Sequence, residues 1–445
     1  MKAPPERGPR QAKHDRNLTL WLGGLAAATI VLGFLIQWLV LTILGPGADT
    51  DALFAALAVP QLAIVVLSNP LANVLVPLLA RANGAELGAD IWAVFLSTLA
   101  LFLGLGLVLG LLAPVWGPLL VPGFGPPAKR LMVALTQVQL LGMALMGTAA
   151  VLRSAYQARH HFIWAALSAV LAAGLTLAFL AWGLPRLGVI AAAWGFTLRS
   201  ALELVLLLPV LGRFRQPAWH TPLLPSAWRR IRPLVLGSAY DRTEILLDRF
   251  LTSLAPAGGL SLYYLAQQIY GAVGQVVNRA VTVPLTPRLA QLAHRGGDWH
   301  GFEVLYRRRM VWIGGVCIAV LVALLLIGEP ALRVVFGVRN VTAADVHALW
   351  WIMIALFGAL VGDIMGNLLN TSFYAADDMM TPTKIGVVVF TLGALFKLGG
   401  FFGWGIIGIA GATTAYYAVR VGALYVALRG KVADGRALAL QAGRE

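Results

Sequence analysis

Five ionisable side chains lie within residues 233–256, an apolar stretch long enough to cross a bilayer; they are Asp241, Arg242, Glu244, Asp248 and Arg249. On a single helix, at 100° per residue, the three acidic side chains share one face and the two arginines form a row beside it. Each charge would cost roughly 2.5–3.5 kcal/mol at the centre of a lipid-facing helix. We therefore expect this helix to border water or a polar interior, as substrate and ion pathways do.

The two rows suit different ligands. The acidic row, Asp241, Glu244 and Asp248, predicts a site for a cation or a coupling ion. The arginine row, Arg242 and Arg249, predicts a site for an anionic head group. A third alternative is a set of internal ion pairs that joins two lobes. Asp248 and Arg249 lie deepest in the stretch and are the strongest candidates of the five.

Other charges in apolar stretches are sparser. Arg279, beside Asn278, lies near the middle of another expected span and is a further candidate for binding an anionic ligand. Arg199 and Glu203 stand four residues apart, so we expect them to pair across one helical turn. Single charges occur in three later spans, at Asp363, Lys397 and Arg420.

The sequence contains no arrangement of residues typical of an enzyme. It has no nucleotide-phosphate loop, no pair of zinc ligands and no Ser/His/Asp grouping that could be placed together. His160 and His161 are expected in a solvated turn, and Cys317 is alone, so no disulfide can form within the chain. We expect no catalytic activity, no metal and no cofactor. Transport would then draw on an ion gradient or on the gradient of the substrate.

The composition indicates a polytopic membrane protein. The 445 residues are 59% hydrophobic and 12% charged, with a mean hydropathy of +0.80. The formal net charge of +15 could indicate nucleic-acid binding. The basic residues, however, lie in short runs between apolar segments, which is typical of membrane topology, so we expect no nucleic-acid partner.

Apolar windows of about 20 residues predict an all-α membrane protein with about twelve transmembrane helices. The expected spans are 18–44, 52–80, 90–115, 129–154, 161–183, 188–211, 233–255, 259–291, 307–328, 344–374, 382–400 and 405–428. In the tails and loops that alternate between the two sides of the membrane, 23 Lys and Arg fall on one side and 6 on the other. Lys397 is counted among the six. The side with more positive charge is cytoplasmic, which places both termini in the cytoplasm.

A basic segment with two tryptophans, residues 212–232, divides the spans six and six. We expect an N-terminal lobe (18–211), this segment as a cytoplasmic amphipathic linker, and a C-terminal lobe (233–428), between cytoplasmic tails at 1–17 and 429–445. Segments 51–82 and 261–293 are weakly alike, and duplicated six-helix units are typical of alternating-access transporters. Five prolines inside expected helices should kink them: Pro60, Pro70, Pro77, Pro284 and Pro287.

Three stretches resemble one family. They are residues 29–60, with GPGADTDALFAALAVP at their end, residues 248–266, and residues 373–385, FYAADDMMTPTKI. In order and spacing they are similar to the MviN/MurJ family, the lipid II flippases of the MOP exporter superfamily. The resemblance covers roughly residues 18–430. It implies two six-helix bundles, as in MATE transporters, around a cavity that opens alternately to each side.

The resemblance also implies a cargo and its binding residues. The cargo is an undecaprenyl-linked precursor whose diphosphate and sugars pass through an arginine-lined cavity. The family's acidic residue is retained as Asp51. Departures occur where Ile30 and Ile36 replace arginines, Gln37 replaces an acidic residue and Gln268 replaces an arginine. The typical family member also has fourteen helices, two more than expected in this chain, so the fold carries over better than the cargo.

Our first hypothesis is therefore a flippase for a polyprenyl-diphosphate-linked saccharide, lipid II or another cell-envelope glycan precursor, in the bacterial inner membrane. Candidate substrate-binding residues are Arg242, Arg249, Arg279, Asp51, Gln37 and Gln268; Asp241, Glu244 and Asp248 are candidates for coupling to H⁺ or Na⁺. Membrane lipids and proteins of cell-envelope biosynthesis are the other expected partners. One alternative is a MATE-like antiporter of organic cations, in which the acidic row faces the cavity. Another is a non-transporting scaffold, in which every buried charge is paired. The sequence leaves the cargo, the coupling ion and the oligomeric state open.

Overall fold

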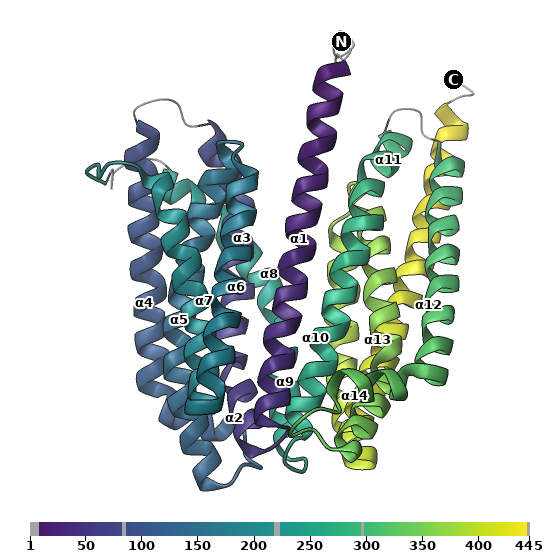
Figure 1. The fold of residues 1–445 in the computed structure, drawn as a ribbon. Coiled ribbons are helices and arrows are strands. Elements are labelled where there is room, and N and C mark those ends of the chain that lie inside the picture. Colours follow the sequence, from purple (N-terminus) through teal and green to yellow (C-terminus); the bar gives the residue numbers. More distant parts are fainter. Residues whose placement is uncertain (1–8, 82–85, 218–222, 295–297, 443–445) are drawn as a thin grey trace. The chain divides into compact units, whose positions relative to one another are not determined.

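A computed structural model describes residues 9–81, 86–217, 223–294 and 298–442 of the chain (Figure 1). Within these ranges the protein is helical and contains no strand, which confirms the predicted all-α class. The elements are α1 (Pro9–Leu44), α2 (Ala48–Ala56), α3 (Ala58–Arg81), α4 (Glu86–Leu120), α5 (Pro126–Ala158), α6 (Phe162–Leu187), α7 (Val189–Leu207), the 3₁₀ turn η1 (Leu208–Leu211), α8 (Leu223–Arg242), α9 (Glu244–Ser253), α10 (Gly259–Val277), the π-helical turn η2 (Asn278–Thr282), α11 (Val283–His294), α12 (Trp299–Phe336), α13 (Ala343–Ala375) and α14 (Met380–Ala442).

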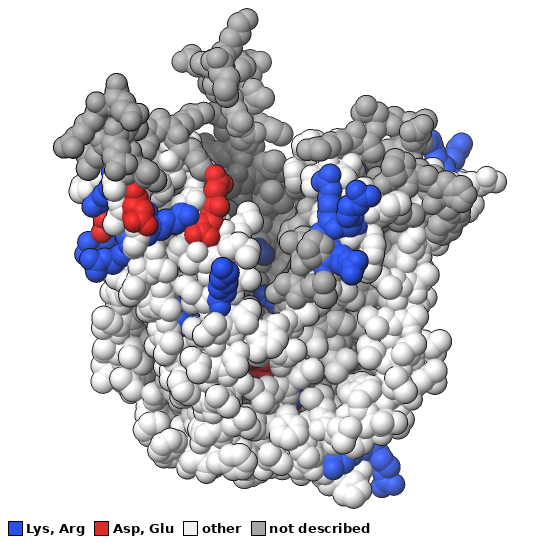
Figure 2. All heavy atoms as spheres, turned by 180° about the vertical axis from the view of Figure 1, so that it is seen from behind, with Lys and Arg blue, Asp and Glu red and all other residues white. Residues whose placement is uncertain are grey.

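Nine helices in the described ranges are long and apolar enough to cross a membrane, so the chain is a multi-pass membrane protein. Figure 2 shows that on one face of each unit described below most Lys, Arg, Asp and Glu gather towards one end, next to a broad uncharged band. The expected spans 52–80, 233–255 and 259–291 lie in interrupted helices, and the expected spans 382–400 and 405–428 both lie in α14. The total of twelve and the side of the membrane that holds the termini stay predictions.

The chain divides into two compact units. The N-terminal unit comprises residues 1–44 and 48–246, and the C-terminal unit comprises residues 45–47 and 247–445. The boundary at Leu246 falls C-terminal to the expected linker, of which residues 218–222 lie outside the described ranges. Residues 223–232 belong to α8, which packs against α3 and buries Ala227 and Ile231. The lobe boundaries expected from the sequence stay a prediction.

In the N-terminal unit α5 is the central helix, packed against α2, α3, α4 and α7, while α1 packs against α6. Small residues on α5 explain this position, because they let neighbouring backbones approach closely in a membrane. A Cβ added to Gly147 would lie 2.6 Å from the Phe102 ring, and one added to Gly142 would lie 3.0 Å from Thr197 Oγ1. The Thr197 hydroxyl donates to the Val138 carbonyl at 3.0 Å, which ties α7 to α5.

In the C-terminal unit α13 packs against α10, α11, α12 and α14. Helix α14 contains a sharp kink, because Trp404 and Gly405 have non-helical backbone angles and Gly405 has a positive φ of 59°. A Cβ on Gly408 would collide with the Gly400 carbonyl, so the two arms of α14 can meet only because these positions are glycine. The arm after the kink runs to Ala442, so most of the predicted C-terminal tail is helical.

The expected seventh span, 233–255, is not one continuous helix, which corrects the prediction of a single row of charges. Helix α8 ends at Arg242 and α9 begins at Glu244. The break lies at Thr243, whose backbone N–H and hydroxyl both donate to the Tyr240 carbonyl, at 3.1 and 2.6 Å. These short-range bonds compete with the regular helical pattern at the carbonyl of Tyr240.

Two of the five prolines lie at breaks in the helices. Pro60 follows the interruption at Leu57 between α2 and α3, and Pro284 follows the π-helical turn η2. The ring nitrogen of each lacks the N–H that would bond to the carbonyl four residues earlier, so the regular ladder cannot continue there. Pro70, Pro77 and Pro287 lie inside continuous helices.

The turn before α14 is built around the Asp378 carboxylate. It accepts the Thr381 backbone N–H at 3.0 Å, the Thr381 hydroxyl at 2.9 Å and the Lys431 ammonium at 3.1 Å. Burial by itself would raise the pKa of Asp378, but these donors together hold it below its ordinary value. Because the folded pKa lies below the unfolded one, the contribution to stability is complete above the unfolded pKa and is lost as the pH falls through the folded pKa.

We expect Asp378→Ala to lower the melting temperature at pH 7 by roughly 2–4 °C, because losing a helix cap costs about 1 kcal/mol. The difference from the wild type should shrink as the pH falls through the lowered pKa of the wild-type Asp378, below which that carboxylate is itself protonated. Thermal melts across this pH range measure both effects. Asp377→Asn, at the exposed neighbouring position with a φ of 54°, is the control and should leave the profile unchanged. A pH-independent loss in Asp378→Ala would contradict this account.

Candidate functional site

A buried ion pair lies inside the C-terminal unit. The Lys397 Nζ of α14 is 2.6 Å from the Asp248 Oδ1 of α9, and the two side chains are only 2% and 3% exposed. Helix α9 places Asp248 on its buried face because Leu251 and Thr252 continue that face into the core. An ion pair this deep is stable only where its remaining hydrogen-bonding groups are also satisfied.

Helices α10 and α14 provide the remaining partners of the pair. The Gln267 amide donates to Asp248 Oδ2 at 2.8 Å, and the Tyr263 hydroxyl donates to the same oxygen at 3.5 Å. The Tyr263 hydroxyl is also 3.5 Å from Thr413 Oγ1. We call these residues, Asp248, Tyr263, Gln267, Lys397 and Thr413, the Asp248 cluster. Both carboxylate oxygens of Asp248 therefore have donors within the protein.

Arg249, the next residue of α9, lies on a different side of the helix. Its guanidinium carbon is 4.7 Å from the centre of the Tyr264 ring, a cation–π contact, and the residue is 2% exposed. Tyr264 follows Tyr263 on α10, so α10 contacts Asp248 and Arg249 with adjacent tyrosines. The two deepest charges predicted from the sequence are therefore buried within the C-terminal unit.

The side of α10 away from Tyr270 carries exposed polar side chains. Gln268 and Gln275 of α10 are exposed and stand seven residues apart on one helical face, and Arg279 of the following π-helical turn η2 is also exposed. We call these three residues the α10 polar row. On the buried face of α10 the Tyr270 hydroxyl donates to the Met353 carbonyl of α13 at 2.6 Å. Tyr270, between Gln268 and Gln275 in the sequence, therefore lies beside α13, a helix long and apolar enough to cross a membrane.

The other predicted site residues are distributed over both units. Asp51 is buried in α2 and Gln37 is half-buried in α1. Arg242 is exposed at the end of α8, and Glu244 is half-buried at the start of α9. These four residues belong to the N-terminal unit. The side chain of Asp241 lies outside the described part of the structure. Of the predicted candidates, Asp248, Arg249, Gln268 and Arg279 belong to the C-terminal unit.

From the sequence, Lys397 was expected as a single charge inside a span and was also counted among the six basic residues of the less basic side, but no partner was predicted for it. The structure buries it in α14, with 1% exposed. A lysine inside an apolar span requires an opposite charge nearby, and this rule was the available signal. Nothing in the sequence identified Asp248, 149 residues away, as the partner.

Glu203 has a closer partner than the predicted Arg199. The Glu203 Oε1 of α7 lies 2.9 Å from the Arg153 Nη2 of α5, so its salt bridge joins two helices, while the charge of Arg199, four residues away, also attracts it. Among the described residues, no group of three or more His, Cys, Asp or Glu side chains could hold a metal ion.

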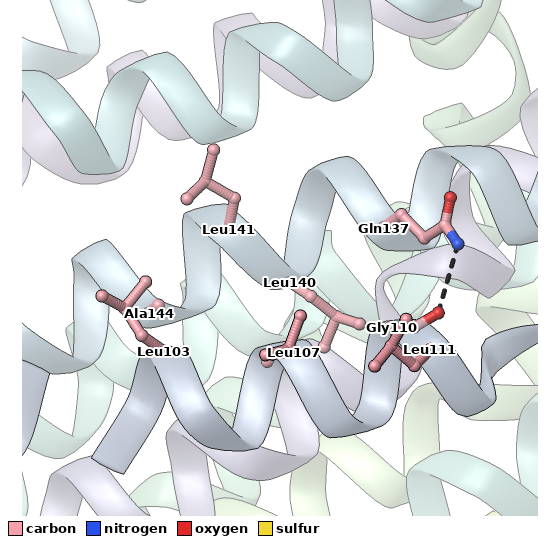
Figure 3. A pocket seen from close by; sticks show the side chains of 9 residues that line it. Leu103, Leu107, Gly110, Leu111, Gln137, Leu140, Leu141 and Ala144 are labelled. Carbon is pink, nitrogen blue, oxygen red and sulfur yellow. Dashed lines mark hydrogen bonds between the residues drawn. The ribbon is translucent and has the colours of Figure 1, made fainter. Parts of the chain in front are cut away.

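A pocket of about 340 Å³ lies between α4 and α5 of the N-terminal unit (Figure 3). Leucines line most of it, and Gln137 is its polar side chain. The Gln137 amide donates to the Gly110 carbonyl at 3.1 Å, as the dashed line in Figure 3 shows. Pro114, four residues after Gly110, has no N–H to offer that carbonyl, so Gln137 replaces a helical bond. An apolar pocket of this kind does not suit a charged ligand.

Comparisons with known proteins identify one family from the sequence. A family model described as "Lipid II flippase MurJ" matches residues 40–442. A probable lipid II flippase MurJ of Haemophilus influenzae is 26% identical over 228 residues, covering 47% of this chain and 43% of the relative. The corresponding protein of Buchnera aphidicola is 20% identical over 388 residues, covering 82% of this chain and 74% of the relative.

Two groups of solved structures share the fold. A lipid II flippase MurJ in an inward closed conformation has a TM-score of 0.80 at 17% identity, covering 92% of this chain and 87% of that chain. An inward-facing multidrug resistance MATE transporter of the MOP superfamily has a TM-score of 0.76 at 15% identity, covering 92% of this chain and 95% of that chain. The match of the family model over most of the sequence decides between the two groups. The chain belongs to the MurJ lipid II flippase family.

Proposed function

We propose that this protein moves a polyprenyl-diphosphate-linked saccharide, lipid II or another cell-envelope glycan precursor, across the bacterial inner membrane by alternating access. The observation that carries the proposal is the α10 polar row, because exposed Gln268, Gln275 and Arg279 would be costly against lipid. A polar row on a membrane-level helix is expected to border water or a polar cargo. Membership of a flippase family supports a transporter without enzymatic activity.

The chemistry of the row suits both polar parts of such a cargo. The Arg279 guanidinium presents a planar fork of donors, which binds phosphate oxygens two at a time. The amides of Gln268 and Gln275 can both donate to and accept from sugar hydroxyls. The polyprenyl tail needs no polar contact and would stay in the bilayer.

Coupling to an ion gradient is assigned to Asp248, with Asp241 and Glu244 as the further candidates. The Asp248 cluster supports this assignment, because a buried ion pair is an expensive feature in a membrane helix and marks ion pathways in other transporters. Asp248 lies in the second turn of α9, the helix that begins after the break at Thr243, so a change in direction at that break would alter its surroundings.

A MATE-like antiporter of organic cations is less well supported. Such a cargo requires a carboxylate whose charge is not already neutralised. The Asp248 carboxylate accepts the Lys397 ammonium at 2.6 Å. The exposed charge of the α10 polar row is positive, which would repel a cationic cargo.

Reconstitution into vesicles tests the proposal. A polyprenyl-diphosphate disaccharide with a fluorescent sugar would be placed in both leaflets, and an added membrane-impermeant quencher would report the fraction that reaches the outer leaflet. We expect the protein to raise this fraction well above that of protein-free vesicles. Uptake of an organic cation without movement of the lipid-linked saccharide would support the antiporter. Movement of neither cargo would support the scaffold.

A further inference from the structure

The ammonium of Lys397 sits where a small monovalent cation would be expected to bind. Its Nζ is 2.6 Å from Asp248 Oδ1. Further oxygens lie around that carboxylate, because the Tyr263 hydroxyl is 3.5 Å from Asp248 Oδ2 and 3.5 Å from Thr413 Oγ1, while the Gln267 amide nitrogen donates to Oδ2 at 2.8 Å. Carboxylate and hydroxyl oxygens are ligands that hard cations prefer.

We propose that Lys397 fills a monovalent-cation site of the C-terminal unit with its own ammonium group, so that Asp248 binds no Na⁺ or K⁺. The site itself is independent of the cargo. The consequence for transport rests on the proposed function: movement of the cargo does not require an alkali cation at Asp248. Of H⁺ and Na⁺, the two coupling ions that the sequence leaves open, Na⁺ is thereby excluded at Asp248.

Burial explains why a cation is needed at this place. Asp248 and Lys397 are 2% and 1% exposed, so water cannot neutralise the carboxylate. A buried carboxylate without a counter-charge is strongly disfavoured and either takes up a proton or binds a cation. The neighbouring Arg249 directs its guanidinium towards the Tyr264 ring, at 4.7 Å. The 2.6 Å contact of Lys397 Nζ with Asp248 Oδ1 therefore provides the neutralising charge.

Removing the lysine side chain beyond Cβ should convert the cluster into a sodium site. In Lys397→Ala the carboxylate and hydroxyl oxygens remain, and the space of the deleted chain is available to an ion with water. Bound Na⁺ would stabilise the folded state by mass action. The wild type should show no such response, because its ammonium already occupies the place.

The experiment compares melting temperatures of the purified protein in NaCl, KCl and choline chloride at equal ionic strength. For the wild type we expect the same value in all three salts. For Lys397→Ala we expect NaCl to raise the melting temperature over choline by roughly 3 °C at ten times the dissociation constant. Lys431→Ala, which removes the half-exposed partner of Asp378, is the matched control and should show no sodium response.

A second measurement keeps the inference testable if Lys397→Ala does not fold. Binding of radioactive Na⁺ to the wild type, with Asp248→Asn as comparison, decides the question without the lysine variant. Sodium binding to the wild type that disappears in Asp248→Asn would overturn the inference, as would a folded Lys397→Ala without a sodium response. Both assays use detergent-solubilised protein without cargo. A failure of the flippase assignment would therefore leave their result intact.

Discussion

Asp248→Ala is expected to destabilise the C-terminal unit by about 3–5 kcal/mol, the usual cost of removing one partner of a buried ion pair. The variant leaves the Lys397 ammonium, 1% exposed, without the carboxylate that lies 2.6 Å away in the wild type. It also removes the acceptor of the Gln267 amide. Thermal melts in detergent should show a fall in melting temperature on the order of 10 °C.

The double variant Asp248→Asn/Lys397→Met tests whether the stability comes from the ion pair itself or from other contacts of Asp248. Replacing both members of a buried pair with uncharged groups of similar size is often neutral or stabilising. We therefore expect the double variant to recover most of the lost stability and to have no coupled transport. A double variant as unstable as Asp248→Ala would show that the carboxylate stabilises the unit through other contacts.

Arg279→Ala is expected to lower transport of the lipid-linked saccharide by roughly 10- to 100-fold. A hydrogen bond to a charged group contributes about 1.5–3 kcal/mol, and a guanidinium makes such bonds to phosphate in pairs. Because Arg279 is exposed, the melting temperature should stay close to that of the wild type. The vesicle assay measures the rate, and a melt measures folding.

A conservative variant and a control variant accompany this prediction. Arg279→Lys retains the charge but not the planar fork, so we expect partial activity. Arg308→Ala removes an exposed arginine from α12 and should leave transport unchanged. Full activity in Arg279→Ala would remove Arg279 from the binding residues and weaken the case for a diphosphate cargo.

The sequence was sufficient for the class of fold and for the family. A composition that is 59% hydrophobic and long apolar windows require membrane helices, because in lipid each span must satisfy its own backbone hydrogen bonds. Motifs at residues 29–60 and 373–385 suggested the family that the model over residues 40–442 confirms. The irregular turns near Pro60 and Pro284 were predictable for a local reason, since proline lacks the donor that a helix needs.

The partners of the charges were decided only by tertiary structure. Periodicity placed Asp241, Glu244 and Asp248 in one row, but the hydrogen bonds of Thr243 divide the helix between α8 and α9. It also failed to indicate that Lys397 reaches Asp248. A helical pattern states which residues share a face, whereas the neighbour of that face depends on how distant helices pack. The same holds for the α10 polar row. Its spacing can be read from the sequence, but its exposure depends on the packing of Tyr270 against α13.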